Sequence, residues 1–429
     1  MIEEITLKNI YSFKDKVTFS FEATADKTFD STHVVVMPNG TRLLKLGIIY
    51  GSNASGKSNF LYAIEDLRYF LTSDPENMDS PTGFEPFMLD KETPNQPSEF
   101  SIKFWVDGIR YCYQLHSTSK SVVYEKLSYY KTTQPIMVFK RVFEDGQSVL
   151  TFNPKVQKIG QEEQKILSLY CLPNKSFFAA RGRINMKMEH IDIVREWIRN
   201  KFMPLIDPGT DMNKYAHKKI SEDNNFKEYL LNFMHWADFN ITGIDSDFIN
   251  EHVPEHIQKL LLENNNVPND MKESLLENGT MKKSVLVFEH TVENKRGTEK
   301  YLMNFRQQSE GTKRMMGIES AIYETINNNA FLAIDEIESS LHPDLLEYIL
   351  QKYLMNSGNS QLLITTHYPG LLSTINDLLR KDNIWFVEKE KNGATDLYSL
   401  VEFNGLNKIS HFERAYRNGQ FGALPNIID

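Results

Sequence analysis

The first part of the chain alternates apolar and polar residues in the pattern of β-strands. This alternation predicts strands over residues 2–10 and 16–21. Residues 43–50 are apolar at nearly every position, which predicts a third strand that is buried on both faces. A helix is predicted from Lys57 to about Phe70, because its apolar residues fall on one helical stripe. The chain therefore begins as a mixed α/β fold.

Two further stretches have the pattern of an antiparallel sheet, and a helical region follows them. Residues 100–113 and 122–143 predict strands, and the Asp-Gly pairs at 107–108 and 145–146 are typical of tight hairpin turns. From about 155 to 280 the pattern changes to polar segments of helical period that are interrupted by prolines. No heptad pattern is sustained there, so no long coiled coil is expected. This region predicts a helical lobe inserted into the sheet domain.

After this lobe, strands and helices alternate again. Strands are predicted over residues 284–290, 330–334 and 361–365, with helices after Gly311 and from His342. This order predicts the second half of the mixed sheet. The expected fold class is α/β, with a mixed sheet, an antiparallel β subdomain and an inserted helical lobe. The expected divisions are residues 1–150 for the first half of the sheet domain, 151–283 for the lobe and 284–429 for the second half.

Composition and charge narrow the functional classes. With 429 residues, of which 41% are hydrophobic and 24% charged, the chain can bury a large core. The two cysteines, Cys112 and Cys171, suit neither a disulfide framework nor a zinc site, so a reducing cytoplasm is expected. No apolar run is long enough to span a bilayer. The net charge of −9 argues against a uniformly basic nucleic-acid surface, although Lys313, Arg314 and residues 181–187 form local basic groups.

Residues 51–58 match the phosphate-loop pattern G-x-x-x-x-G-K-[ST] in full. The match lies between a buried strand and a helix, which is the structural context that this pattern requires. The glycines let backbone N–H groups surround a phosphate, and the following helix directs its positive end at the same charge. We expect Lys57 to contact the β- and γ-phosphates and Ser58 to hold Mg²⁺. The expected nucleotide-binding residues here are Gly51, Ser52, Asn53, Ala54, Ser55, Gly56, Lys57, Ser58 and Asn59.

The predicted strand at 330–334 ends in two adjacent carboxylates, Asp335 and Glu336. We expect Asp335 to lie in the Mg²⁺ shell and Glu336 to be the base that polarises the attacking water. Alternatively, an Asp-Glu pair at a strand end only caps the next helix. The phosphate loop in the same chain favours the catalytic interpretation.

A second anion site is predicted at the start of the helix after Gly311. Serine and glycine at a helix N-terminus can bind an anion, and the sequence here reads Ser309, Glu310, Gly311, Thr312, beginning 26 residues before Asp335. One chain does not need two such sites for a single γ-phosphate. The alternative is that Ser309 is a simple N-cap.

A histidine follows the last predicted strand. His367, in the string Ile-Thr-Thr-His, could donate a hydrogen bond to a γ-phosphate and respond to its loss. A lone histidine at a strand end is usually only a polar terminus, but the order of phosphate loop, Ser309 turn, carboxylate pair and histidine favours a functional role. The expected catalytic residues are therefore Lys57, Glu336 and His367.

Together these motifs resemble those of the ABC-type AAA ATPases of the SMC and RecF branch, in particular the compact bacterial ATPases akin to the OLD family. The matching segments are KNIYSFKD, IIYGSNASGKSNFLYAI, QQSEGTKR, FLAIDEIESSLHP, LLITTHYPG and YRNGQFGALPNI. The resemblance implies an ABC-ATPase head whose signature turn, residues 309–312, faces the nucleotide of the opposite subunit. It also implies that residues 338–343 form the D-loop, although His342 and Pro343 could simply begin a helix. The turn reads SEGT rather than the transporter-like LSGGQ, and no Q-loop glutamine is assignable, although Gln96 lies at a plausible distance.

The resemblance further implies a function and partners. ATP and Mg²⁺ are the expected cofactors, and a homodimer or a higher even-numbered oligomer is expected. Such proteins act in bacterial anti-phage defence and control a separate effector, often a nuclease or a Toprim-type protein. No Toprim-like acidic cluster follows His367, so any nuclease activity is expected in another chain. The alternatives are a RecF/SMC-like repair ATPase that binds DNA directly, and a scaffold that does not hydrolyse ATP.

Overall fold

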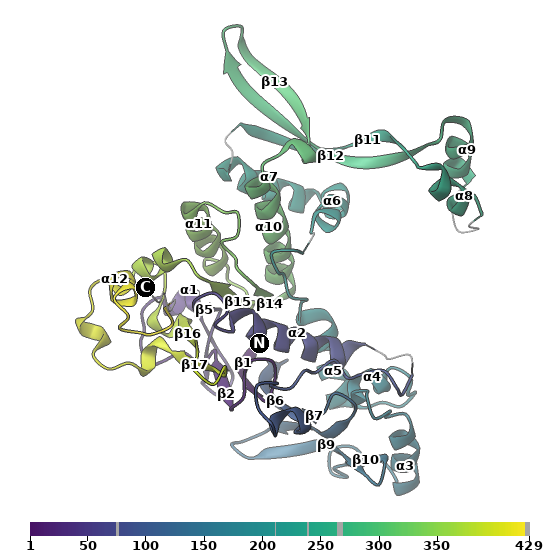
Figure 1. Cartoon of the computed structure of the whole chain (residues 1–429), viewed down its shortest axis with the longest axis vertical. Helices are drawn as coiled ribbons and strands as arrows, with labels where there is room; N and C mark the ends of the chain where they lie inside the picture. The colour runs from purple at the N-terminus through teal and green to yellow at the C-terminus, as the bar shows by residue number, and fades with distance from the viewer. Residues whose placement is uncertain (74–76, 211, 238–239, 264–268, 425–429) are drawn as a thin grey trace. The chain divides into compact units, whose positions relative to one another are not determined.

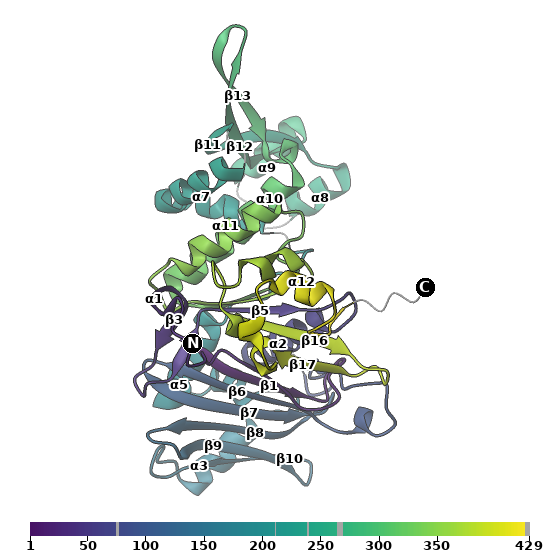
Figure 2. The ribbon, with the colours of Figure 1, turned by 90° about the vertical axis from the view of Figure 1, so that its left-hand side faces the viewer.

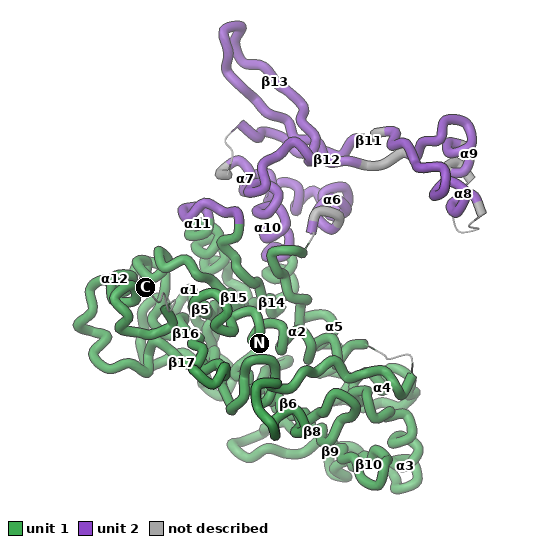
Figure 3. Tube along the Cα trace, in the orientation of Figure 1, with its two compact units in different colours: residues 1–210, 324–339, 346–429 green, residues 211–323, 340–345 purple. Residues whose placement is uncertain are grey.

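The computed structural model describes residues 1–73, 77–210, 212–237, 240–263 and 269–424. Its contacts divide the chain into two compact units (Figure 3). Unit 1 comprises residues 1–210, 324–339 and 346–429, and unit 2 comprises residues 211–323 and 340–345.

The centre of unit 1 is a five-stranded sheet in the order β14-β15-β5-β16-β17, in which only β17 is antiparallel to its neighbour. The strands are β5 (Leu46–Tyr50), β14 (Phe331–Ile334), β15 (Gln361–Thr366), β16 (Ile384–Lys389) and β17 (Thr395–Ser399). Every residue of β5, β14 and β15 is buried, as expected for parallel strands covered on both faces. The carboxyl ends of the four parallel strands share one edge, and the predicted motifs follow three of them.

A seven-stranded antiparallel sheet forms the other part of unit 1, in the order β10-β9-β8-β7-β6-β1-β2 (Figure 2). Its strands are β1 (Ile2–Lys8), β2 (Val17–Ser20), β6 (Ser98–Val106), β7 (Ile109–Ser117), β8 (Val122–Tyr130), β9 (Pro135–Glu144) and β10 (Gln147–Phe152). The predicted Asp-Gly turns join β6 to β7 and β9 to β10, and all four turn residues have positive φ. The predicted strand over 122–143 is two strands, because the chain turns back between Tyr130 and Pro135.

The predicted strand over 43–50 is likewise two strands. β4 (Arg42–Leu44) pairs with β3 (Val34–Val36), whereas β5 belongs to the five-stranded sheet. Lys45 lies between them: its N–H donates to the carbonyl of His33 at 2.9 Å, and its carbonyl accepts from Leu362 N at 2.8 Å. The chain therefore changes partners at Lys45, which apolar character alone does not reveal.

The helices of unit 1 cover these sheets. They are α1 (Asp30–His33), α2 (Lys57–Thr72), α3 (Gln161–Leu169), α4 (Phe177–Arg181), α5 (Glu189–Lys201), α11 (Pro343–Leu354) and α12 (Phe412–Arg417) (Figure 1). The first three residues of α11 belong to unit 2. Helices α4 and α5 pack on the antiparallel sheet through aromatic rings. Trp197 stacks on Phe104 with centroids 4.7 Å apart, and Phe177 contacts Phe139 at 4.8 Å. These contacts explain why residues 161–201 belong to unit 1, although the sequence places them in the lobe at 151–283.

Unit 2 is mixed rather than helical. It contains α6 (Asn213–Glu222), α7 (Asn224–Ala237), α8 (Glu255–Glu263), α9 (Asn269–Asn278) and a three-stranded antiparallel sheet of β11 (Ile241–His252), β12 (Thr280–Asn294) and β13 (Gly297–Asn304). Helix α10 (Glu310–Asn328) begins in unit 2 and ends in unit 1. The predicted strand over 284–290 is part of the longer β12, which has a pairing strand on each side. The long polar strands of this sheet lack the apolar alternation that would have identified them.

Candidate nucleotide-binding site

The phosphate loop leads from the buried strand β5 into helix α2, and its backbone requires small residues at two points. Gly56 has φ +114°, and a Cβ there would lie 2.5 Å from Oγ1 of Thr395. A Cβ on Gly51 would lie 2.7 Å from the carbonyl oxygen of Val387 on β16. Ala54 also adopts a positive φ, 62°. The loop is therefore a tight backbone turn at the N-terminus of a 16-residue helix, as an anion cradle requires.

Lys57 lies against this loop and is 5% exposed. Its Nζ donates to the carbonyl oxygens of Gly51 at 2.9 Å and Ser52 at 3.0 Å. Burial lowers the pKa of Lys57, while the nearby carboxylates of Glu336 and Asp335 oppose that shift. The ammonium group is thus held next to the loop by neutral carbonyls, which a phosphate can replace as a stronger, charged partner.

The other residues of the loop region have mixed surroundings. Ser55 Oγ is buried and makes no hydrogen bond within the described residues, so it could donate to a phosphate oxygen. The side chain of Asn59 instead donates to Ser12 Oγ at 2.9 Å. Thr395 Oγ1 lies 2.8 Å from both Ser12 Oγ and the Ser55 carbonyl, and it supports the loop from β17. Ser12 lies in the segment KNIYSFKD, for which no role at the loop was predicted, and Thr395 belongs to no readable motif.

The carboxylate pair lies where β14 ends. Asp335 is 2% exposed and accepts a 2.5 Å hydrogen bond from Thr365 Oγ1, while the N–H of Glu336 donates to the same hydroxyl oxygen at 2.9 Å. Glu336 has φ +45°, an uncommon conformation for a residue with a side chain. Thr365 therefore fixes both carboxylate residues from the neighbouring strand β15.

His367 is held by a third acidic residue. The N–H of His367 donates to Glu338 Oε1 at 2.7 Å, and the His367 Nδ1 lies 2.9 Å from the same oxygen. The side chain of Glu338 is 12% exposed, whereas that of His367 is 54% exposed. Glu338 thus orients the imidazole. Sequence reasoning assigned Glu338 only to the D-loop, and the single clue to this second role was its proximity to the carboxylate pair.

A cavity of about 660 Å³ lies beside the loop. Its lining joins two predicted parts, the phosphate loop and the His367 segment, with residues of β16 and of the segment around α12. From the predicted parts come residues 51–55, His367 and Pro369; the others are Glu388, Lys389, Tyr416, Arg417 and Leu424. This volume is in the usual range for a small-molecule site. The residues contributed by β16 were missed, because nothing in their local sequence distinguishes them from surface residues. Tyr416, Arg417 and Leu424 lie in the segment YRNGQFGALPNI, for which no role at the nucleotide was predicted.

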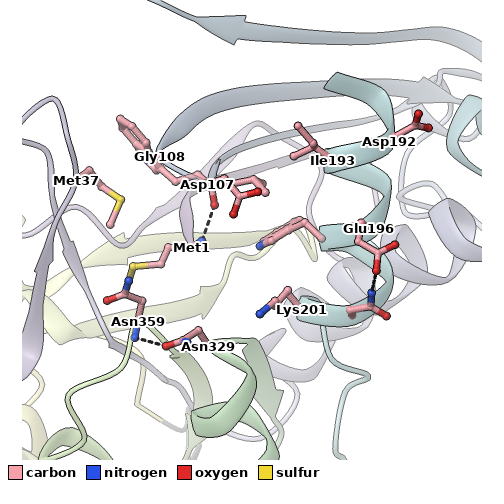
Figure 4. Close-up of a pocket in the computed structure, with 14 residues that line it drawn as sticks. Met1, Met37, Asp107, Gly108, Asp192, Ile193, Glu196, Lys201, Asn329 and Asn359 are labelled. Carbon is pink, nitrogen blue, oxygen red and sulfur yellow. Dashed lines mark hydrogen bonds between the residues drawn. The ribbon is translucent and has the colours of Figure 1, made fainter. Parts of the chain in front are cut away.

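Another cavity of unit 1 is slightly larger, about 720 Å³, but lies elsewhere (Figure 4). Asp107, Glu196, Lys201 and Asn359 are among its lining residues, and none of the predicted nucleotide-binding residues is. We assign the nucleotide to the cavity beside residues 51–55, because that is where the loop and His367 meet.

The predicted signature turn lies in unit 2. Ser309 Oγ accepts from the N–H of Thr312 at 3.1 Å, so Ser309 does cap helix α10. Ser309 and Glu310 are exposed. A Cβ on Gly311 would lie 2.8 Å from the carbonyl oxygen of Ser340, which places the turn directly against the predicted D-loop. An N-cap does not prevent anion binding, because the helix retains further unpaired N–H groups in its first turn.

The residues present fit a magnesium nucleotide. Asp335 offers a buried carboxylate oxygen and Ser58, at the first turn of α2, a hydroxyl, which are the hard oxygen ligands that Mg²⁺ takes together with phosphate and water. Burial raises the pKa of Tyr62, also on α2, and the nearby carboxylate of Asp335 raises it further.

Among the described residues, no helix has the length and apolarity to cross a bilayer.

The sequence matches the model of a family described as "AAA domain, putative AbiEii toxin, Type IV TA system" over residues 47–157 and 213–373. This match covers more than half of the chain, and the chain therefore belongs to this family of AAA domains. The expectation of an AAA-type domain is thereby confirmed. The structure itself has the expected α/β class with a mixed sheet.

Two solved structures illustrate the similarity of fold. The SMC head domain from Thermotoga maritima is 14% identical, with a TM-score of 0.41, and the match covers 93% of this chain and 98% of that one. The Smc head domain bound to the C-terminal domain of ScpA, derived from Pyrococcus furiosus, is 13% identical, with a TM-score of 0.40, and the match covers 95% of this chain and 98% of that one. No curated protein matches the sequence.

Proposed function

We propose that this chain binds and hydrolyses ATP with Mg²⁺, that two copies close around the nucleotides, and that this cycle controls a separate effector protein. The observation that carries the proposal is the meeting of the phosphate loop, the carboxylate pair and His367 at one edge of a single sheet. Membership of an AAA family supports nucleotide binding.

In this proposal each residue has one task. The loop amides and Lys57 would bind the β- and γ-phosphates, and Asp335 and Ser58 would hold a Mg²⁺ ion, whose charge would stabilise the phosphates during transfer. Glu336 accepts a proton from the attacking water. His367, oriented by Glu338, donates a hydrogen bond to the γ-phosphate and loses that partner after hydrolysis. The tight contact of Asp335 and Glu336 with Thr365 supports a preorganised site.

The dimer is proposed from the signature turn. Each copy would offer one phosphate loop and one exposed helix N-terminus at Ser309, so a two-fold arrangement could place the Ser309 turn of one copy on the γ-phosphate bound by the other. The position of Ser340 against Gly311 supports a shared signature and D-loop surface. ATP would then act as part of the interface, and its hydrolysis would weaken the dimer.

The effector and the defence role rest on the resemblance and on the family description. That description names a putative toxin of a type IV toxin–antitoxin system, which supports a role alongside a second protein in a bacterial response. A tagged chain that co-purifies with the product of a neighbouring gene in the presence of ATP would support effector control. If the purified chain alone binds DNA in an ATP-dependent and steeply salt-sensitive way, the repair ATPase replaces this proposal.

The Glu336→Gln variant tests the catalytic and dimer proposals together. We expect ATP hydrolysis to fall by about 100-fold or more, because removal of a general base costs on this order. ATP binding should persist, and the ATP-bound dimer should accumulate, as detected by light scattering. Glu144→Gln, an exposed carboxylate on β9, is the control and should behave like the wild type. Wild-type turnover without dimer accumulation in Glu336→Gln would refute both proposals.

A further inference from the structure

Residues 412–424 form one wall of the cavity beside the phosphate loop. Helix α12 supplies Tyr416 and Arg417 to its lining, and Leu424 contributes from the end of the segment. The opposite part of the lining is the loop itself, residues 51–55. We call residues 412–424 the wall segment.

The wall segment is anchored where the loop begins. The ring of Tyr416 stacks on Phe386 of β16 with centroids 5.7 Å apart, and lies 6.1 Å from the ring of Tyr50, the residue immediately before the loop. Tyr416 Oη donates to the carbonyl of Ala423 at 3.1 Å, which closes the segment on itself. Helix α12 therefore has a fixed position relative to β5 and β16, and Arg417 is held beside the loop.

A second contact fixes the other end of the wall segment. Gly422 has φ +65°, and a Cβ there would lie 2.6 Å from both Glu388 Oε2 and Tyr398 Oη. Tyr398 Oη also donates to the carbonyl of Phe421 at 2.9 Å. The segment thus packs against the side chains of Glu388 on β16 and Tyr398 on β17.

Arg417 is the side chain in this wall with the right chemistry for a phosphate. Its guanidinium is 59% exposed, and both Nε and Nη2 lie 2.9 Å from a single oxygen, Glu413 Oε1. An exposed pair of this kind contributes little stability, so exchanging Glu413 for another anion costs little. The planar guanidinium has paired N–H donors that match phosphate oxygens.

We infer that Arg417 binds the phosphates of the nucleotide held by its own phosphate loop. The cavity lining carries two other charged side chains from β16, Lys389 and Glu388, whose charges offset each other, so Arg417 is the cationic side chain of the lining available to a phosphate. The inference rests on the proposed function, because it requires a nucleoside phosphate in this cavity. It adds a binding residue that lies outside the phosphate loop, the carboxylate pair and the signature turn.

Equilibrium binding of ATP, ADP and AMP to the Arg417→Ala protein tests this inference. We expect the Kd for ATP to rise about 10-fold, as for the loss of a charge-assisted hydrogen bond, with a smaller change for AMP. Arg414→Ala is the matched control, because Arg414 is exposed on the same helix but does not line the cavity. Equal ATP affinities for the Arg417→Ala and Arg414→Ala proteins would overturn the inference.

The Glu413→Gln variant distinguishes phosphate binding by Arg417 from a purely structural role of the Arg417–Glu413 ion pair. If Arg417 serves only to hold helix α12 through Glu413, both substitutions should weaken ATP binding equally, and this result would overturn the inference. If Arg417 binds phosphate, Glu413→Gln frees the guanidinium, and ATP binding should be unchanged or tighter. The proposed function has its own control: an ATP affinity that is undetectable in the wild type, or unaffected by Lys57→Ala, contradicts that function itself rather than the role of Arg417 alone.

Discussion

Helix α10, which begins at the signature turn, carries a buried carboxyl group that should make unit 2 sensitive to pH. Glu319 is 1% exposed; one of its oxygens accepts a 2.6 Å hydrogen bond from Tyr229, and the other makes no hydrogen bond within the described residues. Burial raises the pKa of Glu319 to about 8, although the bond from Tyr229 opposes the shift. We predict that Glu319→Gln makes unit 2 more stable near neutral pH.

The sign and the size of the effect follow from this pKa. In the unfolded chain Glu319 has its ordinary pKa of 4.5. Between that value and about 8 the unfolded state has lost the proton that the folded state keeps, so the free energy of unfolding decreases as pH rises. The limiting slope is about 1.4 kcal/mol per pH unit, which gives roughly 2 kcal/mol between about pH 5.5 and about pH 7.5. A glutamine at 319 does not titrate and still accepts from Tyr229.

Urea unfolding at these two pH values measures the effect. The quantity to compare is the loss of unfolding free energy between the two pH values, measured in the unfolding transition of unit 2. This loss should be smaller by about 2 kcal/mol in the Glu319→Gln protein than in the wild type. Glu293→Gln is the control, because Glu293 is exposed in the same unit. If wild type and Glu319→Gln lose equal stability between the two pH values, the carboxyl is already ionised in the folded state and the reasoning fails.

Two further substitutions test residues that support the site. In Glu338→Ala the imidazole of His367 loses its acceptor, so kcat for ATP should fall about 10-fold with little change in KM, and Glu338→Gln, which keeps an acceptor, should restore part of the rate. A loss of ATP binding as large as the fall in kcat would contradict this positioning role. Thr395→Val removes the hydroxyl that contacts Ser12 and the Ser55 carbonyl, so ATP affinity should fall several-fold while Thr395→Ser stays close to wild type. Isothermal titration calorimetry measures the ATP affinity of each variant. An unchanged ATP affinity in Thr395→Val would contradict the role proposed for Thr395 in supporting the loop.

The central parts of the site could be predicted because each depends on a short, continuous stretch of chain. The phosphate loop needs Gly51 and Gly56 for its backbone and Lys57 for its charge, and these residues are necessarily close in sequence. The carboxylates must follow an apolar strand, because the carboxyl end of β14 is where the sheet meets the site. Local chemistry and local conformation therefore identify these residues before any contact is known.

The boundaries of the units were less predictable, because they depend on which faces pack together. Helix α5 has a polar, helix-period sequence like those of unit 2, and α4 is only five residues long. The stacking of Trp197 on Phe104 and the contact of Phe177 with Phe139 assign them to the antiparallel sheet. In unit 2, β11 and β13 were missed, and only residues 284–290 of β12 were predicted as a strand. β13 exposes most of its residues, so it has no apolar face to generate an alternating pattern.

The supporting residues of the site could not be predicted, because each acts across a long separation in sequence. Thr365 fixes Asp335 from the next strand, and Thr395 reaches the loop at Ser55 from a strand some 340 residues later. Arg417 lies in the segment YRNGQFGALPNI, but its exposed side chain becomes a candidate ligand only because aromatic packing holds its helix beside the loop. Motifs thus indicate the groups proposed for the chemistry, whereas the residues that position those groups depend on the fold and are not marked by their local sequence.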